Sequence, residues 1–506
     1  MKFLKQTAAV LAGTLLTGSC ISPAAVSAKD TAPAYPWEYG DVNGDNSVDV
    51  ADAVLTARYV AADPTATVTD MGRSCADVNL DGNVDGTDIT QILEYIAKKR
   101  EYLGHPKTSD PGYQSFSLTK DLTAQTVSDK AVDEAFVKSQ YDLTAKLMKE
   151  ISFSETEHDN ILLSPLSIAS ALAMTANGAD GETRAEMEQL LGGTLSMEEL
   201  NAYYLNYLAN LPSSDKAKLN VANSIWNSEE LQIRDDYLQT VKDYYPNMDV
   251  FKAPFTDSTM GEINSWISDK TDDMIQDMLK YMAPNAVTYL INALAFDAEW
   301  ENAWKETADG VFTDYDGTKL DVTMMKGTEK YYISDKYAEG FIKPYAGGTY
   351  SFVGILPRES LSVTLSDYVG MMDADSLQKL LSSRTEEAVQ VSLPKFRFEY
   401  DTGDTLLVSA LQKLGMKKAF SGEADFSKLY EKNSEGVYIG RVLHNTFIDV
   451  NEAGTQAAAA TVVEMTRQGG GALSLSFSRP FLFMIIDERT QLPVFIGSVR
   501  NPGKTA

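Results

Sequence analysis

Two stretches near the amino terminus carry oxygen-bearing side chains at matching intervals, and such side chains bind hard cations. The first runs from Asp41 to Asp52, and the second, from Asp77 to Asp88, repeats its register 36 positions later. Ca²⁺ takes about six to eight oxygen ligands, which carboxylate, amide and hydroxyl groups supply. A single Asp- and Asn-rich run is usually a solvated turn, but two in one register predict a pair of calcium ions. The expected ligands are Asp41, Asn43, Asp45, Ser47, Asp49, Asp52, Asp77, Asn79, Asp81, Asn83, Asp85 and Asp88.

Each acidic loop is followed by a stretch with helical spacing, residues 53–62 after the first and 89–99 after the second. No helix of matching quality is expected before either loop. Gly82, and less ideally Asn46, occupy the sharp turn, where a positive φ favours glycine. The duplicated loop-then-helix unit, of about 60 residues, resembles the dockerin module, which attaches an enzyme or an inhibitor to a cohesin on a cellulosome scaffold.

The dockerin resemblance implies which residues contact the cohesin. In that family the two residues before the last ligand of each loop lie at the interface, together with residues of the following helix. The two copies differ at these positions, so whether both faces bind equivalently stays open. The implied contact residues are Val50, Ala51, Gly86 and Thr87, with Arg58 and Glu94 as weaker candidates.

A second unusual segment lies towards the carboxyl terminus, where small residues precede β-branched ones and a glycine-rich tip. The four alanines 457–460 favour a helix, whereas Val462 and Val463 favour a strand. With the period of a strand, one face carries no charge and little bulk, so it could enter a sheet. A small-residue surface helix or a flexible loop is the alternative. The uncharged face consists of Thr455, Ala457, Ala459, Thr461, Val463 and Met465.

The residues after this tip predict a buried hairpin, because two apolar stretches, 478–487 and 492–499, flank a polar turn. The hairpin resembles the carboxyl-terminal signature of the serpins, and residues 451–460 resemble their reactive-loop hinge. Other segments follow the family order over about 370 residues, from 129 to 502. These upstream segments are 160–168, 169–178, 221–226, 290–300, 391–396 and 411–420.

The serpin resemblance implies an α+β serpin fold, with large mixed and antiparallel sheets, surrounding helices and an exposed reactive loop. The irregular mixture of helical and strand patterns also favours an α+β layout over a doubly wound parallel sheet. The small dockerin is expected to be α-helical, with its two calcium loop-helix units.

In serpins a target protease cuts the reactive loop and forms an acyl-enzyme, after which the hinge enters the sheet as an added strand and the protease stays trapped. Neither proline nor a charged residue interrupts 454–463, which favours inhibition over a non-inhibitory serpin. The implied hinge residues are Glu452, Gly454, Thr455, Ala457, Ala458, Ala459 and Ala460.

Several residues are candidates for the bond that the protease cuts. The family's usual register puts cleavage between Gln468 and Gly469, whereas counting back from Pro480 lands about one residue later. Arg467 would suit a trypsin-like specificity pocket, and Met465 would suit an elastase- or subtilisin-like one. The exact bond stays open.

The resemblance also implies a shutter, a buried hydrogen-bonded cluster that controls the separation of the sheet strands. A lone histidine is more often an ordinary core or surface group, and the shutter role is itself structural, not catalytic. Trp300 is expected at the top of the sheet. The implied shutter residues are Ser164, Ser167, Asn292 and His444.

The amino-terminal 28 residues have the layout of a secretory signal peptide: a basic start, an apolar run at 8–16 and small residues before the cut. The apolar run is too short to span a bilayer. A loose match to a lipoprotein cleavage box at Cys20 makes a lipid anchor the alternative. After ordinary cleavage only Cys75 remains, so no internal disulfide is expected.

The chain of 506 residues is long enough for one large and one small domain. We expect a signal peptide at 1–28, a dockerin at 38–100, a linker at 101–128 and a serpin domain at 129–503 that opens with a helix at 131–150. The linker is rich in Gly, Pro, Ser, Thr and Lys. The net charge of −28 argues against nucleic acid as a partner, and the acidity outside the calcium loops is expected to be a solvated surface.

These inferences predict a secreted, extracellular protein of the cell-surface cellulosome. It would trap serine proteases and bind a cohesin through its calcium-loaded dockerin. A non-inhibitory serpin with a structural or carrier role is the alternative. An enzyme is not expected, because GxSxG, HExxH and phosphate-loop motifs are missing and none of the three histidines has a nucleophile setting. The expected partners are a subtilisin-, elastase- or trypsin-like protease and a cohesin; we expect a monomer without a transmembrane segment.

Overall fold

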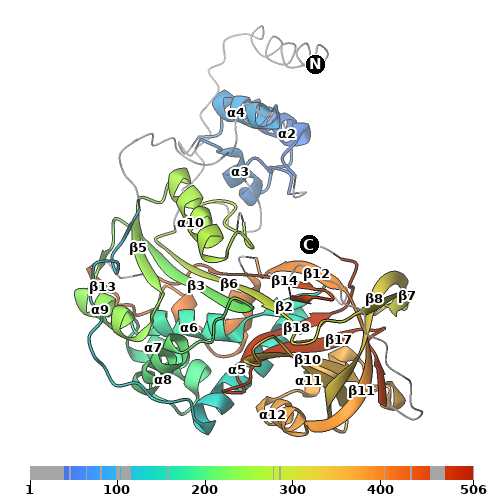
Figure 1. Ribbon diagram of the computed structural model, residues 1–506. Helices are drawn as coiled ribbons and strands as arrows, with labels where there is room; N and C mark the ends of the chain where they lie inside the picture. Colours follow the sequence, from blue (N-terminus) through green and yellow to red (C-terminus); the bar gives the residue numbers. More distant parts are fainter. Residues whose placement is uncertain are drawn as a thin grey trace. The chain divides into compact units, whose positions relative to one another are not determined.

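The structure, a computed structural model, describes most of the chain after residue 38. The residues described are 39–44, 47–63, 65–79, 83–97, 103, 115–155, 159–276, 278–283, 286–403, 405–432, 436–455 and 473–504. The chain divides into two compact units (Figure 1), one formed by 1–111 with 282–285 and the other by 112–281 with 286–506.

The smaller unit contains the helices α2 (Val50–Val60), α3 (Asp70–Ala76) and α4 (Gly86–Ile96). The helices α2 and α4 start three residues earlier than expected, because Asp49 and Asp85 cap them from inside the acidic loops. Each cap carboxylate accepts a hydrogen bond at 2.6 Å, Asp49 from the Ala51 N–H and Asp85 from the Thr87 N–H. A seven-residue helix, α3, ends directly before Asp77, although no helix of matching quality was expected before either loop.

The small unit has its own apolar core, which joins the two repeats. The helices α2 and α4 contact each other, and Val42 and Val78 take corresponding buried places in the two loops. Its buried apolar side chains are Tyr39, Val42, Ala53, Ala76, Val78, Val84, Ile92 and Leu103.

Two large sheets organise the described part of the larger unit. The first has seven strands and the second nine. In order across the first sheet, the strands are β1 (Phe116–Ser117), β5 (Asp249–Ala253), β3 (Ala217–Ser228), β6 (Thr288–Glu299), β15 (Gly454–Thr455), β14 (Val442–Val450) and β12 (Phe396–Asp401). In the second, the order is β16 (Leu473–Ser476), β11 (Thr385–Pro394), β8 (Lys319–Ser334), β9 (Ala338–Pro344), β10 (Tyr350–Pro357), β17 (Phe481–Asp487), β18 (Pro493–Val499) and β2 (Ile161–Leu163), while β7 (Glu306–Thr313) pairs with β8.

The apolar strand pairs expected from the sequence are present. The strands β3 and β6 pair antiparallel, with Asn223 opposite Asn292, and β17 and β18 form the buried carboxyl-terminal hairpin. A further two-stranded sheet pairs β4 (Gln232–Ile233) with β13 (Tyr430–Lys432). All seven residues of β17 and all seven of β18 are buried, as their continuous apolar sequences predict.

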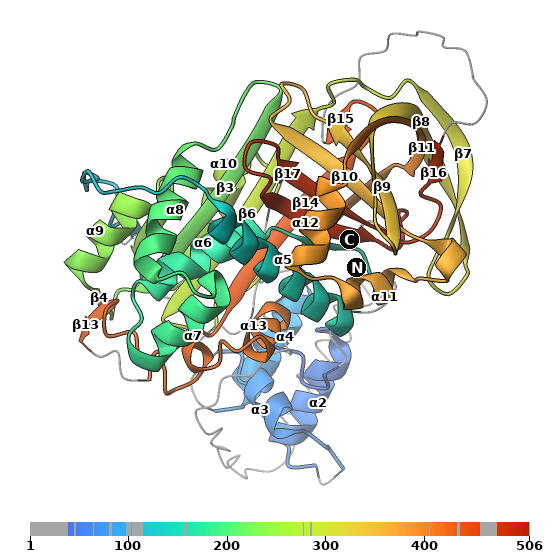
Figure 2. The same ribbon diagram turned by 90° about the horizontal axis from the view of Figure 1, so that it is seen from below.

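Helices cover the first sheet on both faces. The helix α6 contacts β3 and β6, and α10 contacts β3 from the opposite side of the sheet (Figure 1). Figure 2 shows α6, α7 and α8 together on the same side of β3 and β6. The helices of this unit are α5 (Glu134–Ser154), α6 (Pro165–Ala176), α7 (Gly181–Gly192), α8 (Met197–Ala209), α9 (Asp235–Tyr244), α10 (Asp257–Lys270), α11 (Leu365–Met371), α12 (Ala374–Ser382) and α13 (Leu406–Lys413), with 3₁₀ turns at Glu359–Leu361 and Lys418–Phe420.

Two boundaries at the start of the larger unit differ from the expectation. The helix α5 begins at Glu134 instead of residue 131, because the Asp133 side chain caps it by accepting the Phe136 N–H at 3.1 Å. The strand β1 lies inside the expected linker 101–128 yet pairs antiparallel with β5 at the sheet edge. A two-residue edge strand is held by its partner's backbone, so the composition of the segment did not predict it.

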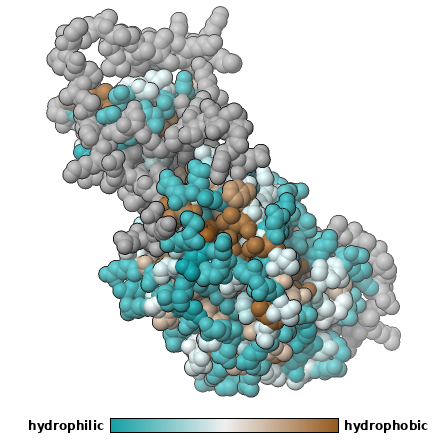
Figure 3. Space-filling view, turned by 90° about the vertical axis from the view of Figure 1, so that its left-hand side faces the viewer, coloured by the Kyte–Doolittle hydropathy of each residue, from teal (hydrophilic) through white to brown (hydrophobic). Residues whose placement is uncertain are grey.

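The face of the molecule drawn in Figure 3 is mostly hydrophilic, with brown hydrophobic residues gathered mainly in the upper part of the larger unit. Across the residues that the structure describes, every helix is too short or too polar to cross a membrane.

Candidate functional site

The first sheet is closed at one end of its centre and open at the other. The strands β6 and β14 pair directly in parallel, from Leu290 opposite Val442 to Leu294 opposite Thr446. Beyond Leu294 they diverge, and β15 occupies the space between them. Its Thr455 lies opposite Ala298 of β6 and opposite Val450 of β14. The chain leading into the predicted reactive loop therefore already contributes the first residue of an added strand.

A tight turn, Asn451–Gly454, brings the chain from β14 back into this gap. The Asn451 N–H donates to the Gly454 carbonyl at 2.9 Å, and the Asn451 side-chain oxygen accepts the Ala453 N–H at 2.9 Å. The indole N–H of Trp300 donates to the Asn451 carbonyl at 2.9 Å, and the Trp300 backbone N–H donates to the Ala453 carbonyl at 2.8 Å. Trp300 is buried, and its two N–H groups bind the first and third residues of the turn.

An ion pair ties the same turn to the edge of the sheet. The Glu452 carboxylate lies against the Lys395 ammonium group. The backbone carbonyl of Glu452 accepts the backbone N–H of Trp304 at 2.9 Å. Partial burial of Glu452 opposes ionisation, but the hydrogen bond from Lys395 prevails and the pKa of this carboxyl is lowered. Because both side chains are partly exposed, the pair adds only a small amount of stability, about 0–1 kcal/mol.

Thr455 itself is fully buried, and its hydroxyl lies 2.6 Å from the hydroxyl of Tyr345. Tyr345 follows β9 and is also fully buried. Its ring stacks on Trp300, with 4.4 Å between centroids and 14° between planes. Of the predicted hinge, the structure describes Glu452, Gly454 and Thr455. The hinge residues Ala457, Ala458, Ala459 and Ala460 and the scissile-bond candidates Met465, Arg467, Gln468 and Gly469 lie outside the described residues.

A second buried cluster lies where β6 and β14 still pair. His444 of β14 faces Asn292 of β6, and its Nδ1 lies 2.5 Å from the Asn292 side-chain oxygen. Its Nε2 accepts the Ser164 backbone N–H at 3.2 Å, so Nδ1 carries the proton and donates to Asn292. The Asn292 amide then donates to the Ser167 hydroxyl at 2.8 Å. The four predicted shutter residues thus form one connected network.

The network includes two residues that the sequence reasoning missed. Asn223 of β3 accepts hydrogen bonds from Ser167 at 2.9 Å and from Asn292 at 3.0 Å. Its amide donates to the Ser170 hydroxyl at 2.9 Å. A signal was available, because residues 221–226 were expected to form a central strand of the large sheet, and an amide buried in such a strand requires partners. The network therefore joins β3, β6 and β14 to the start of α6.

Burial determines the charge of the histidine. The side chain of His444 is fully buried, and desolvation lowers its pKa to about 3. The imidazole is therefore neutral at neutral pH, which is the form that both hydrogen bonds of the network require.

The last carboxylate of each acidic loop is a structural acceptor. Asp52 accepts backbone N–H groups from Val42 at 2.8 Å and Asp49 at 2.9 Å, and Asp88 accepts those of Val78 at 3.0 Å and Asp85 at 2.8 Å. Both carboxylates are fully buried. Burial raises the pKa of Asp88 to about 6, although a backbone hydrogen bond from Asp85 opposes the rise.

The donor chemistry of these loops fits a calcium ion. All the predicted side-chain ligands offer carboxylate, amide or hydroxyl oxygen, and the buried acidic groups place negative charge where a cation would offset it. Within the described ranges no three His, Cys, Asp or Glu side chains lie close enough to hold a metal. The predicted ligands Asp45 and Asp81 lie outside those ranges.

The two helices that follow the loops present different surfaces. On α2, Val50 is 49% exposed and Val54, one turn later, 38% exposed. The corresponding residues of α4 are Gly86 and Thr90, and the Thr90 hydroxyl donates to the Gly86 carbonyl at 2.8 Å. The sequence reasoning singled out Val50 but missed Val54, which the four-residue helical spacing places on the same face.

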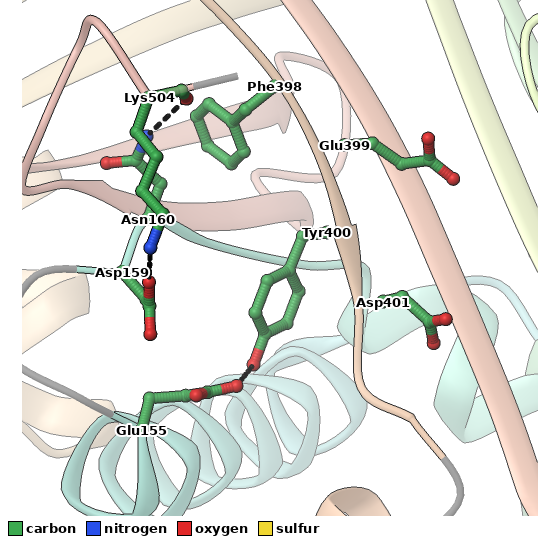
Figure 4. A pocket seen from close by; sticks show the side chains of 8 residues that line it. All are labelled: Glu155, Asp159, Asn160, Phe398, Glu399, Tyr400, Asp401 and Lys504. Atoms are coloured by element: carbon green, nitrogen blue, oxygen red, sulfur yellow. Dashed lines mark hydrogen bonds and ion pairs between the residues drawn. The ribbon is translucent and has the colours of Figure 1, made fainter. Parts of the chain in front are cut away.

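An acid-rich cavity of about 300 Å³ lies between the end of α5 and the edge strand β12 (Figure 4). Tyr400 donates a hydrogen bond to the Glu155 carboxylate at 2.8 Å, and Lys504 pairs with Asp159. None of the predicted site residues lines this cavity, which is lined by Glu155, Asp159, Asn160, Phe398, Glu399, Tyr400, Asp401 and Lys504.

Comparisons with known proteins agree with this architecture. The family model for "Serpin (serine protease inhibitor)" matches residues 138–502, and that for the dockerin type I domain matches 39–97. An uncharacterized serpin-like protein of Thermococcus kodakarensis is 31% identical over 411 residues, which cover 79% of this chain and 92% of that protein.

Solved structures show the same fold. The native state of the thermophilic serpin tengpin is 42% identical with a TM-score of 0.72, covering 77% of this chain and 100% of that one. Human thyroxine-binding globulin is 26% identical with a TM-score of 0.65, covering 73% and 99%.

The two sheets, with a short strand entering the gap in the first, define a serpin fold, and the predicted α+β class is confirmed. The chain belongs to the serpin family and also contains a dockerin type I domain. Serpins are as a class protease inhibitors and not enzymes. The presence of a dockerin supports attachment of this serpin to a cellulosome, an extracellular assembly.

Proposed function

We propose that this protein is a secreted inhibitor that traps serine proteases by inserting its cleaved reactive loop into the first sheet, while its dockerin holds it on a cohesin-bearing scaffold. The observation that carries the inhibitory part is the gap between β6 and β14. Thr455 already occupies the open end of this gap, and the remaining uncharged face of the hinge follows it in sequence.

The proposed mechanism uses the chain's own strands to supply the driving force. The target protease attacks the loop as a substrate and forms an acyl-enzyme with the residue before the cut. The freed hinge then continues β15 between β6 and β14, forming ladder hydrogen bonds with both strands. Because the protease is still covalently attached, it is carried along and its active site is deformed before water can release it.

A mixing experiment tests the trapping. The purified protein is incubated with trypsin-, chymotrypsin-, elastase- and subtilisin-like proteases and analysed on denaturing gels and by intact mass. A denaturant-resistant adduct with release of a carboxyl-terminal fragment is expected, and the fragment's first residue identifies the bond among the candidates Met465, Arg467, Gln468 and Gly469. Cleavage by every protease without an adduct would refute inhibition and favour the structural or carrier serpin.

We assign residues 1–28 to a signal peptide, 38–100 to the dockerin, 101–114 to the linker and 115–503 to the serpin domain. The pairing of β1 with β5 in the first sheet supports a linker shorter than the 101–128 expected from the sequence. Export without lipidation at Cys20 would place the inhibitor among the enzymes of the scaffold, where it would protect them from proteolysis.

Removal of calcium is expected to unfold the smaller unit and to abolish cohesin binding. Without a cation, no positive charge offsets the buried carboxylates of Asp52 and Asp88 or the other acidic side chains of each loop. In calorimetry, EDTA should remove the unfolding transition of the smaller unit and leave the unfolding temperature of the serpin domain unchanged. The dissociation constant for a cohesin should rise at least about 100-fold. A calcium-independent transition and unchanged cohesin binding would contradict the two-ion assignment.

Of the two dockerin faces, we propose that the first repeat's face binds the cohesin, because its apolar residues Val50 and Val54 are exposed. Val54→Asp is expected to weaken cohesin binding about tenfold or more, since a charge replaces an apolar contact at the interface. The matched change in the second repeat, Thr90→Asp, is expected to alter it less than about twofold. Titration calorimetry on the calcium-loaded full chain measures both. Equal losses would mean that both faces are used.

A further inference from the structure

We infer that Tyr345 is a positioning residue for loop insertion: its hydroxyl holds Thr455 in the sheet gap before any protease has cut the loop. The inference rests on the proposed trapping function and adds to it a residue outside the hinge. Tyr345 lies 110 positions before Thr455, in the turn between β9 and β10 of the second sheet.

The hydroxyl pair is the central contact. The oxygens of Tyr345 and Thr455 lie 2.6 Å apart, and both side chains are fully buried. A buried hydroxyl that loses its partner pays the full cost of desolvation. Burial raises the pKa of Tyr345, so the group stays a neutral phenol that can donate or accept. Withdrawal of Thr455 from the gap would therefore leave the Tyr345 hydroxyl without the partner that it has here.

The position of the Tyr345 hydroxyl is itself rigidly determined. The ring stacks on Trp300 and meets Phe296 edge-on, with 5.0 Å between centroids and 75° between planes. The Tyr345 backbone also forms a β-bridge with Trp300, and its N–H donates to the Tyr350 carbonyl at 3.0 Å. The phenol thus projects from a packed aromatic cluster and cannot follow Thr455 if the hinge moves out.

The same cluster holds the turn that precedes Thr455. Trp300 binds the carbonyls of Asn451 and Ala453, so the stacked pair Trp300–Tyr345 contacts both this turn and Thr455, the first inserted residue. Starting a new strand normally requires the ends of a free segment to be brought together, which costs entropy. Because Thr455 is already seated, the cleaved loop can extend an existing strand instead of starting one.

Two isosteric substitutions separate this role from ordinary packing. Tyr345→Phe removes the hydroxyl and keeps the stacked ring. Tyr350→Phe is the matched control: its ring is also fully buried and meets Phe296 edge-on, but its hydroxyl donates to the Pro212 carbonyl at 2.8 Å, away from the hinge. Amide hydrogen exchange of the uncut full chain is followed by mass spectrometry on the peptide that contains Gly454 and Thr455.

We expect exchange of this peptide to be about fivefold faster in Tyr345→Phe and unchanged in Tyr350→Phe. Thr455→Val should match Tyr345→Phe, the double variant should be no faster than either single one, and Thr455→Ser should retain slow exchange. Equal exchange in Tyr345→Phe and Tyr350→Phe would overturn the inference.

A second measurement connects the position of Thr455 in the gap to loop insertion. With a protease that forms an adduct, the number of inhibitor molecules consumed per trapped protease should rise about fivefold in Tyr345→Phe, because slower insertion lets more acyl-enzyme hydrolyse. If exchange is faster in Tyr345→Phe but the number of inhibitor molecules consumed per trapped protease is unchanged, the positioning role is overturned. If the unmodified protein traps no protease at all, the proposed function fails, and the exchange comparison still decides whether Tyr345 holds the hinge.

Discussion

Thr455→Arg should convert the protein from an inhibitor into a substrate. Thr455 is fully buried between β6 and β14, and its hydroxyl faces that of Tyr345. A guanidinium group placed there would be an uncompensated buried charge, which costs about 3–5 kcal/mol. The arginine therefore keeps the hinge out of the gap, and the acyl-enzyme is hydrolysed before the loop inserts. We expect the yield of covalent adduct to fall at least about 100-fold while the rate of loop cleavage stays within about twofold.

The adduct yield is read from denaturing gels at a series of molar ratios, with Thr455→Ser as the control that keeps the hydroxyl. Cohesin binding by the Thr455→Arg protein should be unchanged, because the substitution lies in the serpin domain. An arginine variant that still traps protease at wild-type yield would mean that the hinge does not insert at this position. The same result would remove the main support for the proposed mechanism.

The second large effect is expected at His444. His444→Ala should lower the thermal midpoint of the serpin domain, because it leaves the Ser164 N–H and the Asn292 side-chain oxygen buried without partners. Two unpaired polar groups together with a small cavity correspond to a loss of about 3 kcal/mol or more. Scanning calorimetry at a fixed rate measures the shift, since unfolding of a kinetically trapped fold depends on the scan rate.

The same histidine predicts how stability depends on pH. The pKa of His444 is about 3 in the folded protein, against about 6.5 for an ordinary histidine. Between these values the unfolded chain binds a proton that the folded chain does not, so unfolding becomes more favourable as the pH falls. Stability should decrease from about pH 6.5 towards pH 3, with this one group contributing roughly 4 kcal/mol at the lower end.

A neutral replacement isolates this contribution from that of the many carboxylates. His444→Gln should be less stable than the unmodified protein near pH 7, but its stability should fall less steeply between about pH 6.5 and pH 4. Parallel pH profiles for the two proteins would show that His444 titrates normally and is not held neutral by its burial.

Local sequence determined the elements and the chemistry of the candidate site. Continuous apolar runs predicted the hairpin β17–β18, and the register of the acidic repeats predicted two equivalent loops followed by helices. The absence of charged side chains from residues 454–463 indicated a segment that could enter a sheet. These properties follow from side-chain periodicity and local hydrogen-bond chemistry, which neighbouring residues determine among themselves.

Only the tertiary structure decided which distant groups meet. The seating of Thr455 depends on the divergence of β6 from β14 and on a tyrosine of the other sheet, and nothing near residue 455 in the sequence indicates either. Asn223 joined the shutter for the same reason, and β1 became a strand because β5 offered an unpaired edge. Contacts between segments far apart in the sequence depend on how the strands are ordered in a sheet, and that order is a property of the packed molecule as a whole.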